Sequence, residues 1–109
     1  MLTNFENLEL KLSTAVETYE WKALQSSFNS AEVVYMIGKG GNMAVASHGA
    51  ADATRLTDKR VHCLDSQSHL TSIANDHGYD KLFEQWLESY ADLDKRTLVI
   101  GFSGSGNSA

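Results

Sequence analysis

The residues with the clearest chemical potential form a run of serines and glycines near the end of the printed sequence. Ser103-Gly104-Ser105-Gly106-Asn107-Ser108 follows a short apolar segment at residues 97–100, which predicts a buried strand. Glycines let a backbone approach a ligand closely, and hydroxyls with exposed N–H groups can bind a phosphate without a lysine. A helix beginning near Asn107 would add its positive dipole end. We therefore expect a phosphate-binding loop here; the alternative is an ordinary Ser/Gly turn after a core strand.

A second glycine-rich segment, Gly38-Lys39-Gly40-Gly41-Asn42, follows the apolar run at residues 33–37. An unbroken run of this kind is typical of a strand covered on both faces. Asn42 is a candidate N-cap for an alanine-rich helix from Met43 to about Leu56. The two glycine segments are therefore expected to be loops that follow two different strands.

His48 and Asp52 lie four residues apart in that helix and therefore share one face. Imidazole and carboxylate can both bind zinc, although a zinc site needs at least three protein ligands. A carboxylate can also move the proton next to a carbonyl, which is the step that aldose–ketose isomerisation requires. The alternative is a solvated helical pair with no chemical role.

The elements that must position these residues alternate between helix and strand. The expected order is a helix from Thr3 or Asn4 to about Phe28, then a strand at 33–37, a helix at 43–56, a strand at 61–64, helices at 66–74 and 79–90 separated by a turn at 75–78, and a strand at 97–100. Such alternation predicts an α/β fold with a parallel sheet and right-handed crossovers. Ligands of these sheets bind beyond the carboxyl ends of the strands, where both glycine segments lie.

The first helix carries an apolar stripe formed by Phe5, Leu8, Leu12, Ala15 and Tyr19. Its length would be roughly 35–40 Å, which is too long for a domain of this size to cover. We therefore expect residues 1–30 to form an oligomerisation helix, and the alternative is a helix that lies on its own core.

Composition limits the remaining possibilities. A sequence of 109 residues fits a single domain, and its net charge of −5 with scattered basic residues argues against a nucleic-acid surface. No segment is long and apolar enough to span a membrane. The single cysteine, Cys63, excludes an internal disulfide and fits a reducing compartment, so we expect a cytoplasmic location.

Two familiar nucleotide-binding motifs do not fit. Neither glycine segment ends in the Gly-Lys-Ser/Thr of a P-loop. Gly104, Gly106 and Ala109 satisfy the dinucleotide pattern G-x-G-x-x-G/A, but they follow the third strand and no acidic residue comes about 20 positions later.

The segments taken together resemble a sugar isomerase (SIS) domain of the phosphoheptose isomerase branch. The resemblance rests on their order along the chain: Ile37-Gly38-Lys39-Gly40-Gly41-Asn42, His48, Ile73-Ala74-Asn75-Asp76, and Gly101 through Ser108. It implies a flavodoxin-like, three-layer α/β sandwich and a homo-oligomer, dimer or tetramer, formed through the N-terminal helices. Known members of this branch convert sedoheptulose 7-phosphate to D-glycero-D-manno-heptose 7-phosphate with zinc in the site.

The same resemblance assigns roles by position. The sugar phosphate would be bound by Ser103, Gly104, Ser105 and Ser108; the rest of the substrate would be contacted by Gly40, Gly41, Asn42, Asn75 and Asp76. His48 falls on the family's histidine metal ligand, and Asp52 on its catalytic, metal-binding glutamate.

The sequence departs from the family in three ways. Lys39 stands where the family usually has asparagine, and Asp52 is one methylene shorter than the glutamate it replaces. The family's chain also continues past this length, so we expect a C-terminally truncated, N-terminal part that lacks a glutamine and a histidine of the metal site. Besides an isomerase, the alternatives are a non-catalytic SIS module that binds a phosphosugar or a partner protein, as one branch does for the replication initiator, and a structural fragment with an open sheet edge.

Overall fold

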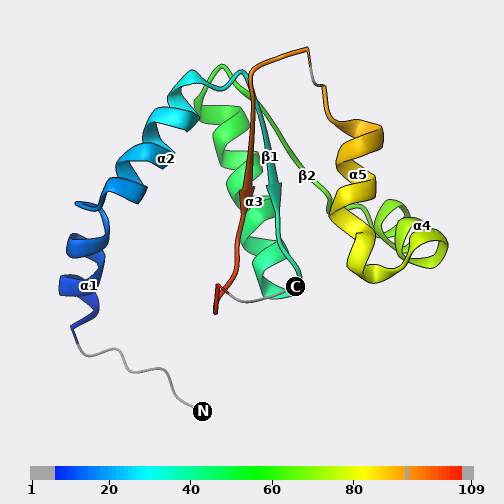
Figure 1. Cartoon of the computed structure of the whole chain (residues 1–109), viewed down its shortest axis with the longest axis horizontal. Helices are drawn as coiled ribbons and strands as arrows, with labels where there is room; N and C mark the ends of the chain where they lie inside the picture. Colours follow the sequence, from blue (N-terminus) through cyan, green and yellow to red (C-terminus); the bar gives the residue numbers. More distant parts are fainter. Residues whose placement is uncertain (1–6, 93, 107–109) are drawn as a thin grey trace. The chain divides into compact units, whose positions relative to one another are not determined.

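The computed structural model describes residues 7–92 and 94–106, and the chain divides into two compact units, Met1–Ser30 and Ala31–Ala109. The first unit holds α1 (Leu8–Ala15) and α2 (Tyr19–Ser30) (Figure 1). Neither helix has a buried residue. Their apolar side chains therefore find no core of their own within the described residues.

The expectation of one continuous first helix is wrong, because the helix breaks at residues 16–18. The N–H groups of Glu17 and Thr18 bond to carbonyls three residues back rather than four, which tightens the last turn of α1. The hydroxyl of Thr18 then accepts the N–H of Trp21 at 3.2 Å and caps the start of α2. The start expected at Thr3 or Asn4 lies outside the described residues.

The second unit is an α/β sandwich, as the sequence predicts. Its elements are β1 (Val33–Ile37), α3 (Gly41–Leu56), β2 (Arg60–Cys63), α4 (Gln67–His77), a 3-10 turn η1 (Tyr79–Lys81), α5 (Leu82–Tyr90) and β3 (Thr97–Gly101). The three strands are parallel in the order β2-β1-β3, and the arrangement is consistent with a flavodoxin-like fold. Strand β1 is central, and both β2 and β3 pair with it.

The strand register brings the carboxyl ends of β1 and β3 together. Val33 pairs with Arg60 on one side and with Thr97 on the other, so the strands begin level. The β1–β3 pairing continues to Ile37 and Gly101, and one further bond joins the Phe102 N–H to the Ile37 carbonyl at 3.0 Å. The loops that follow β1 and β3 therefore leave the sheet side by side.

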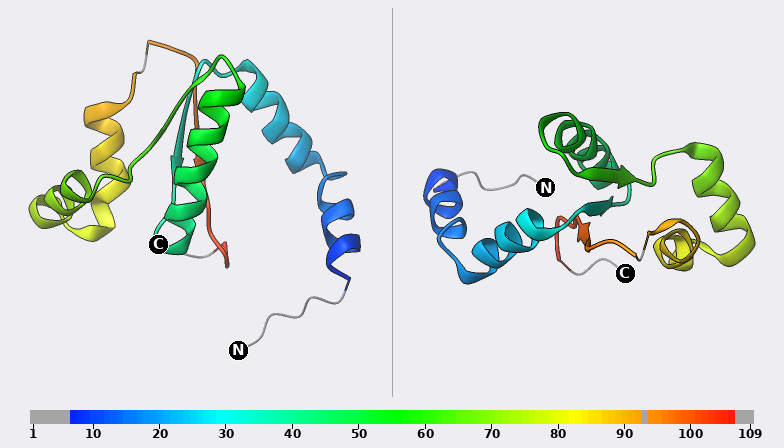
Figure 2. Two further views of the ribbon diagram at one scale, coloured as in Figure 1. Left: turned by 180° about the vertical axis from the view of Figure 1, so that it is seen from behind. Right: turned by 90° about the horizontal axis from the view of Figure 1, so that it is seen from above.

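Helices cover both faces of β1. Val34 and Met36 face α3, whose small residues Ala46 and Ala50 are buried. The other face of β1 packs against α4 and α5 through a cluster of Val33, Tyr35, Leu64, Ile73, Leu82 and Trp86. Figure 2 shows α3 on one side of the sheet and α5 on the other. Complete burial of each large side chain contributes about 1.5–3 kcal/mol, so these clusters fix both helices on the sheet.

Tyr35 connects this core to the loop before β3. Its ring is 1% exposed and meets the Trp86 ring edge to face, with ring centres 5.6 Å apart. Its hydroxyl oxygen accepts the N–H of Asp92 at 2.7 Å. The buried hydroxyl thus has a partner, and the chain is held as it leaves α5 for β3.

Two local expectations differ from the structure. Gly40, with φ 61°, precedes the first residue of α3, so Asn42 is not the N-cap and lies inside the helix. Helix α4 continues through Asn75 and Asp76, which were expected in a turn, and ends only at Gly78, whose φ of 94° favours glycine. No helix among the described residues is both long and apolar enough to cross a lipid bilayer.

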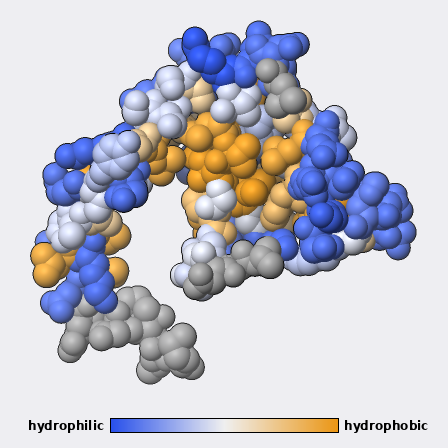
Figure 3. Space-filling view, viewed as in Figure 1, coloured by the Kyte–Doolittle hydropathy of each residue, from blue (hydrophilic) through white to orange (hydrophobic). Residues whose placement is uncertain are grey.

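Strand β3 is an edge strand of the described sheet. Val99 on β3 is 43% exposed, and Leu98 and Ile100 are only partly buried. Figure 3 shows apolar surface over this strand.

Gly38 is required by close backbone packing, which leads to a stability prediction. A Cβ at Gly38 would lie 2.6 Å from the carbonyl carbon of Asn42 and 3.0 Å from the nitrogen of Met43, whereas a Cβ at Gly41 would have nothing within 4 Å. We expect Gly38→Ala to lower the free energy of unfolding by about 1–3 kcal/mol, because backbone must shift against backbone. Gly41→Ala is the matched control and should leave stability within about 0.5 kcal/mol. Urea unfolding of both variants tests this, and equal stability would contradict the packing described.

Candidate functional site

A pocket of about 340 Å³ lies at the carboxyl edge of the sheet. The loop after β1 supplies Ile37, Gly38, Lys39 and Asn42, the loop after β3 supplies Gly101, Phe102 and Ser103, and α5 supplies Phe83. Residues from both glycine-rich segments therefore line one hollow, at the position where parallel sheets bind ligands. Of the substrate-binding residues predicted in these segments, Asn42 and Ser103 line it, whereas Gly40, Gly41, Gly104 and Ser105 are not among the lining residues.

The loop after β1 turns directly into α3. The N–H of Asn42 bonds to the Lys39 carbonyl at 3.2 Å, and the N–H of Met43 bonds to the Gly40 carbonyl at 3.0 Å. The positive φ of Gly40 makes this turn possible. The amino end of a 16-residue helix thus begins beside the pocket, where its dipole favours an anion.

The loop after β3 is held by a bond within itself. The oxygen of Ser103 accepts the N–H of Gly106 at 2.9 Å, and Gly106 has φ 77°. Residues 103–106 are all exposed. Ser108 and the helix expected near Asn107 lie outside the described residues.

Packing does not explain why two of the loop residues are glycine. A Cβ on Gly41 or Gly104 would meet open space, and neither residue has a positive φ. Gly38, by contrast, is fixed by the backbone that it contacts. Open space above Gly41 and Gly104 is what a backbone that approaches a ligand would have.

Lys39 lines the pocket and is held by aromatic rings. Its Nζ lies 4.3 Å from the centre of the Tyr79 ring and 5.8 Å from the centre of the Phe83 ring. Lys39, Phe83 and Phe102 also line the pocket, although the sequence motifs did not mark them as site residues. Phe83 has the apolar spacing of a core residue of α5, and no local signal marks it as a pocket residue.

His48 and Asp52 face each other on α3, as their spacing predicts. The His48 Nε2 lies 3.4 Å from the Asp52 Oδ2, and the Arg55 guanidinium bonds to the other oxygen of Asp52 at 2.6 Å. Neither His48 nor Asp52 is among the residues that line the pocket.

The described residues do not complete a zinc site. No group of three or more His, Cys, Asp or Glu side chains in the described part of the chain could hold a metal ion. His48 and Asp52 have suitable donor atoms, but two ligands are one short of the minimum for zinc. Arg55 also competes with any cation for the Asp52 carboxylate.

Asn75 and Asp76 lie near the end of α4 and are exposed. The side-chain amide of Asn75 donates to the Asp76 carboxylate at 3.2 Å. Neither residue lines the pocket described above. The structure therefore does not bring them together with the two glycine loops.

A second hollow lies along β2, and its cysteine is a poor nucleophile. His62 and Cys63 line it, and Ser47 donates to Asp65 there at 2.6 Å. Burial, helped by the charge of Asp65, raises the pKa of the Cys63 thiol to about 11, so the nucleophilic thiolate is scarce at neutral pH. Burial, helped by Arg60, lowers the pKa of His62.

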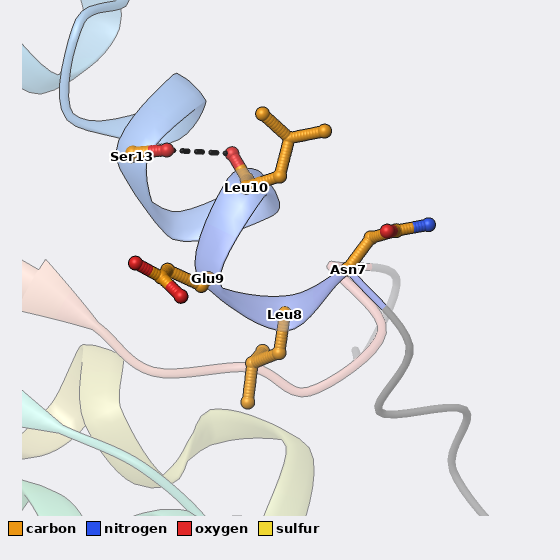
Figure 4. Close-up of a pocket in the computed structure, with 5 residues that line it drawn as sticks. All are labelled: Asn7, Leu8, Glu9, Leu10 and Ser13. Atoms are coloured by element: carbon orange, nitrogen blue, oxygen red, sulfur yellow. Dashed lines mark hydrogen bonds between the residues drawn. The ribbon is translucent and has the colours of Figure 1, made fainter.

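A third hollow surrounds the first turn of α1. Figure 4 shows that its side chains, Asn7, Leu8, Glu9 and Leu10, point in different directions, and that the Ser13 hydroxyl bonds to the Leu10 carbonyl. Side chains that diverge in this way do not converge on a ligand, so we assign no site to this hollow.

Comparison with known proteins gives relatives of one kind. The phosphoheptose isomerase of Aliarcobacter butzleri is 36% identical and covers 94% of this chain, which spans 52% of that protein. That of Geobacter sulfurreducens is 33% identical over 94% of this chain and 56% of its own length. That of Helicobacter pylori strain Shi470 is 37% identical over 69% of this chain and 41% of its own length.

The chain thus spans about half the length of the curated relatives it matches. No family model and no solved structure matches it. The relatives cover the segments that carry the motif resemblance, and the parallel α/β sheet is the fold that the resemblance implies. The similarity to several phosphoheptose isomerases, each about twice as long, is consistent with an N-terminal part of a protein of the sugar isomerase (SIS) family.

Proposed function

We propose that this chain binds a phosphorylated sugar in the pocket between the loops that follow β1 and β3. The observation that carries the proposal is that two glycine-rich loops from neighbouring parallel strands line one pocket. The Ser103 hydroxyl can donate to the phosphate, and the amino end of α3 adds its positive dipole end. The names of the relatives support a heptose phosphate as the ligand.

We further propose that the whole protein to which this chain corresponds is a phosphoheptose isomerase, which interconverts sedoheptulose 7-phosphate and D-glycero-D-manno-heptose 7-phosphate. Such a reaction needs a base beside the carbonyl, and Asp52 is the carboxylate that the family resemblance assigns to it. Asp52 lies on α3, the helix whose first residues border the pocket. The described residues support binding more directly than they support this catalytic step.

One observation favours a non-catalytic binding module instead. Arg55 donates to an Asp52 oxygen at 2.6 Å, so that oxygen already has a hydrogen-bond partner within the chain. In this alternative the pocket binds a phosphosugar, or the surface binds a partner protein, without turnover. A protein that binds sedoheptulose 7-phosphate but never releases the heptose product would support the module.

We propose that zinc, where the protein binds it, takes His48 and Asp52 as two of its ligands, and that this chain alone binds it weakly. Bound zinc would polarise the sugar carbonyl as a Lewis acid. The His48–Asp52 pair supports this proposal, because its imidazole nitrogen and carboxylate oxygen lie 3.4 Å apart on one helix.

We also propose that residues 1–30 join copies of this chain into a homo-oligomer. Leu8, Leu12 and Tyr19 are 45%, 58% and 81% exposed, and neither α1 nor α2 has a buried residue. Exposed apolar side chains of this kind gain about 1.5–3 kcal/mol for each large side chain that association buries.

The phosphate assignment predicts the effect of removing hydroxyls from the loop after β3. The double variant Ser103→Ala/Ser105→Ala should bind sedoheptulose 7-phosphate at least about tenfold more weakly, because a hydrogen bond to a charged group contributes roughly 1.5–3 kcal/mol. Isothermal titration calorimetry measures the affinity. Ser72→Ala/Ser89→Ala is the control, since these hydroxyls bond to carbonyls within α4 and α5. Unchanged affinity in the loop variant would remove the assignment.

The metal proposal predicts a weak zinc affinity that depends on His48. His48→Ala should weaken zinc binding by at least about tenfold, because even the loss of an outer-shell partner costs about 10–100-fold. His77→Ala, at the end of α4, is the control and should behave as the unmodified chain. Titration against a chromogenic zinc chelator measures both. Zinc affinity that is the same in the two variants would show that His48 is not a ligand.

The association proposal predicts that one added charge on the apolar stripe separates the copies. Leu12→Glu should shift the sedimentation coefficient toward that of a monomer, because it would bury a carboxylate in the contact. Ser13→Glu adds the same charge at the next position of α1 and should leave the assembly intact. Sedimentation velocity over a range of concentrations distinguishes them. An unmodified chain that is monomeric throughout would refute the proposal.

A further inference from the structure

Lys39 enters the pocket from the β1–α3 loop, and its position is set by residues far from it in the sequence. Its Nζ lies 4.3 Å from the centre of the Tyr79 ring in η1 and 5.8 Å from that of Phe83 in α5. Cation–π contacts of this kind occur within about 6 Å of a ring centre. The ammonium is thus held by two elements other than its own.

These rings orient the lysine without cancelling its charge. An aromatic face attracts a cation through its quadrupole but carries no net charge itself. Phe83, the more distant of the two rings, lines the pocket, and Tyr79, the nearer one, is not among the lining residues. Lys39 lines the same pocket as Ser103, so its side chain brings a formal positive charge to the hollow that Ser103 borders.

The rest of the pocket offers hydrogen-bond donors but no second cation. Among the described residues that line it, Lys39 is the charged one; the others are Ile37, Gly38, Asn42, Phe83, Gly101, Phe102 and Ser103. A phosphate monoester is close to a dianion at pH 7. Neutral donors alone would leave most of that charge without an opposite charge, and a charge-assisted bond is roughly twice as strong as a neutral one.

We propose that Lys39 is the charged anchor of this pocket and binds the phosphate of the sugar phosphate together with the Ser103 loop, with Tyr79 and Phe83 as its positioning residues. This inference rests on the proposed function and adds to it the source of the charge. It predicts an affinity that falls as ionic strength rises, because the interaction between an ammonium and a phosphate at a pocket mouth is screened by salt.

The test compares four proteins by calorimetric titration with sedoheptulose 7-phosphate and with inorganic phosphate, at 20 mM and 200 mM salt. The proteins are the unmodified chain, Lys39→Gln, Tyr79→Leu and Lys81→Gln. Lys81→Gln is the matched control: it removes the same charge from the neighbouring η1, where Lys81 pairs with Glu84. Circular dichroism confirms that each variant is folded.

We expect Lys39→Gln to weaken both ligands by roughly 10–100-fold at low salt and to reduce the salt dependence. Tyr79→Leu should weaken them by only about two- to fivefold and keep the salt dependence, because the charge remains while its positioning is lost. A purely structural role of Lys39 would not change the salt dependence. Lys81→Gln should match the unmodified chain.

Two failures can be told apart. If the unmodified chain binds neither ligand, the proposed function and this inference both fail. If it binds both and Lys39→Gln matches Lys81→Gln, only the role of Lys39 is wrong. Gluconate is titrated as a third ligand, because it carries a carboxylate and no phosphate. If gluconate binds as tightly as sedoheptulose 7-phosphate, and if Lys39→Gln weakens that binding, the assignment to phosphate is wrong.

Discussion

The candidate site depends on the parallel pairing of β1 with β3. Their hydrogen bonds run in register from Val33 and Thr97 to Ile37 and Gly101, and the Phe102 N–H extends them by one more bond. A slip of one residue would turn every side chain of β3 to the opposite face of the sheet. It would also carry the serine loop away from the glycine loop of β1. The pocket is therefore a consequence of strand register, and its glycines and serines can act together only while that register holds.

Close packing on both sides of β1 supports this register. On one side α3 approaches the sheet through small residues, and a Cβ at Gly49 would lie 3.3 Å from the sulfur of Met36. On the other side Tyr35 and Trp86 fix α5, the helix that carries Phe83 into the pocket. The same buried cluster thus holds the sheet together and places the ring that orients Lys39. Helix α5 contributes residues both to the buried core and to the pocket. A change in the packing of α5 would therefore alter the pocket.

Much of this fold could be predicted from the sequence, because alternating apolar runs and helical patterns define a parallel sheet. That sheet in turn implies that the loops at 38–42 and 101–106 meet at one edge, as they do. The break between α1 and α2 could not be predicted from apolar spacing, since it depends on the Thr18 hydroxyl capping a second helix. Helix α4 runs past Asn75 because Gly78 ends it later than the polar residues suggested.

The site was less predictable than the fold, for a physical reason. Spacing of four residues was enough to place His48 beside Asp52, but it did not predict that Arg55 would take the other carboxylate oxygen. The rings of Tyr79 and Phe83 meet Lys39 only through tertiary packing, which leaves no trace in local sequence. The action of the predicted site residues on a ligand stays a prediction. Those that do not line the pocket are Gly40, Gly41, His48, Asp52, Asn75, Asp76, Gly104 and Ser105.

The central claim is that the two loops form one phosphate site, and amide chemical shifts measure it most directly. In a titration of ¹⁵N-labelled chain with inorganic phosphate, the N–H signals of Gly40 and Gly41 should move together with those of Ser103 through Gly106, all along one binding curve with one dissociation constant. Shifts confined to one loop, or two loops that respond with different dissociation constants, would contradict the account.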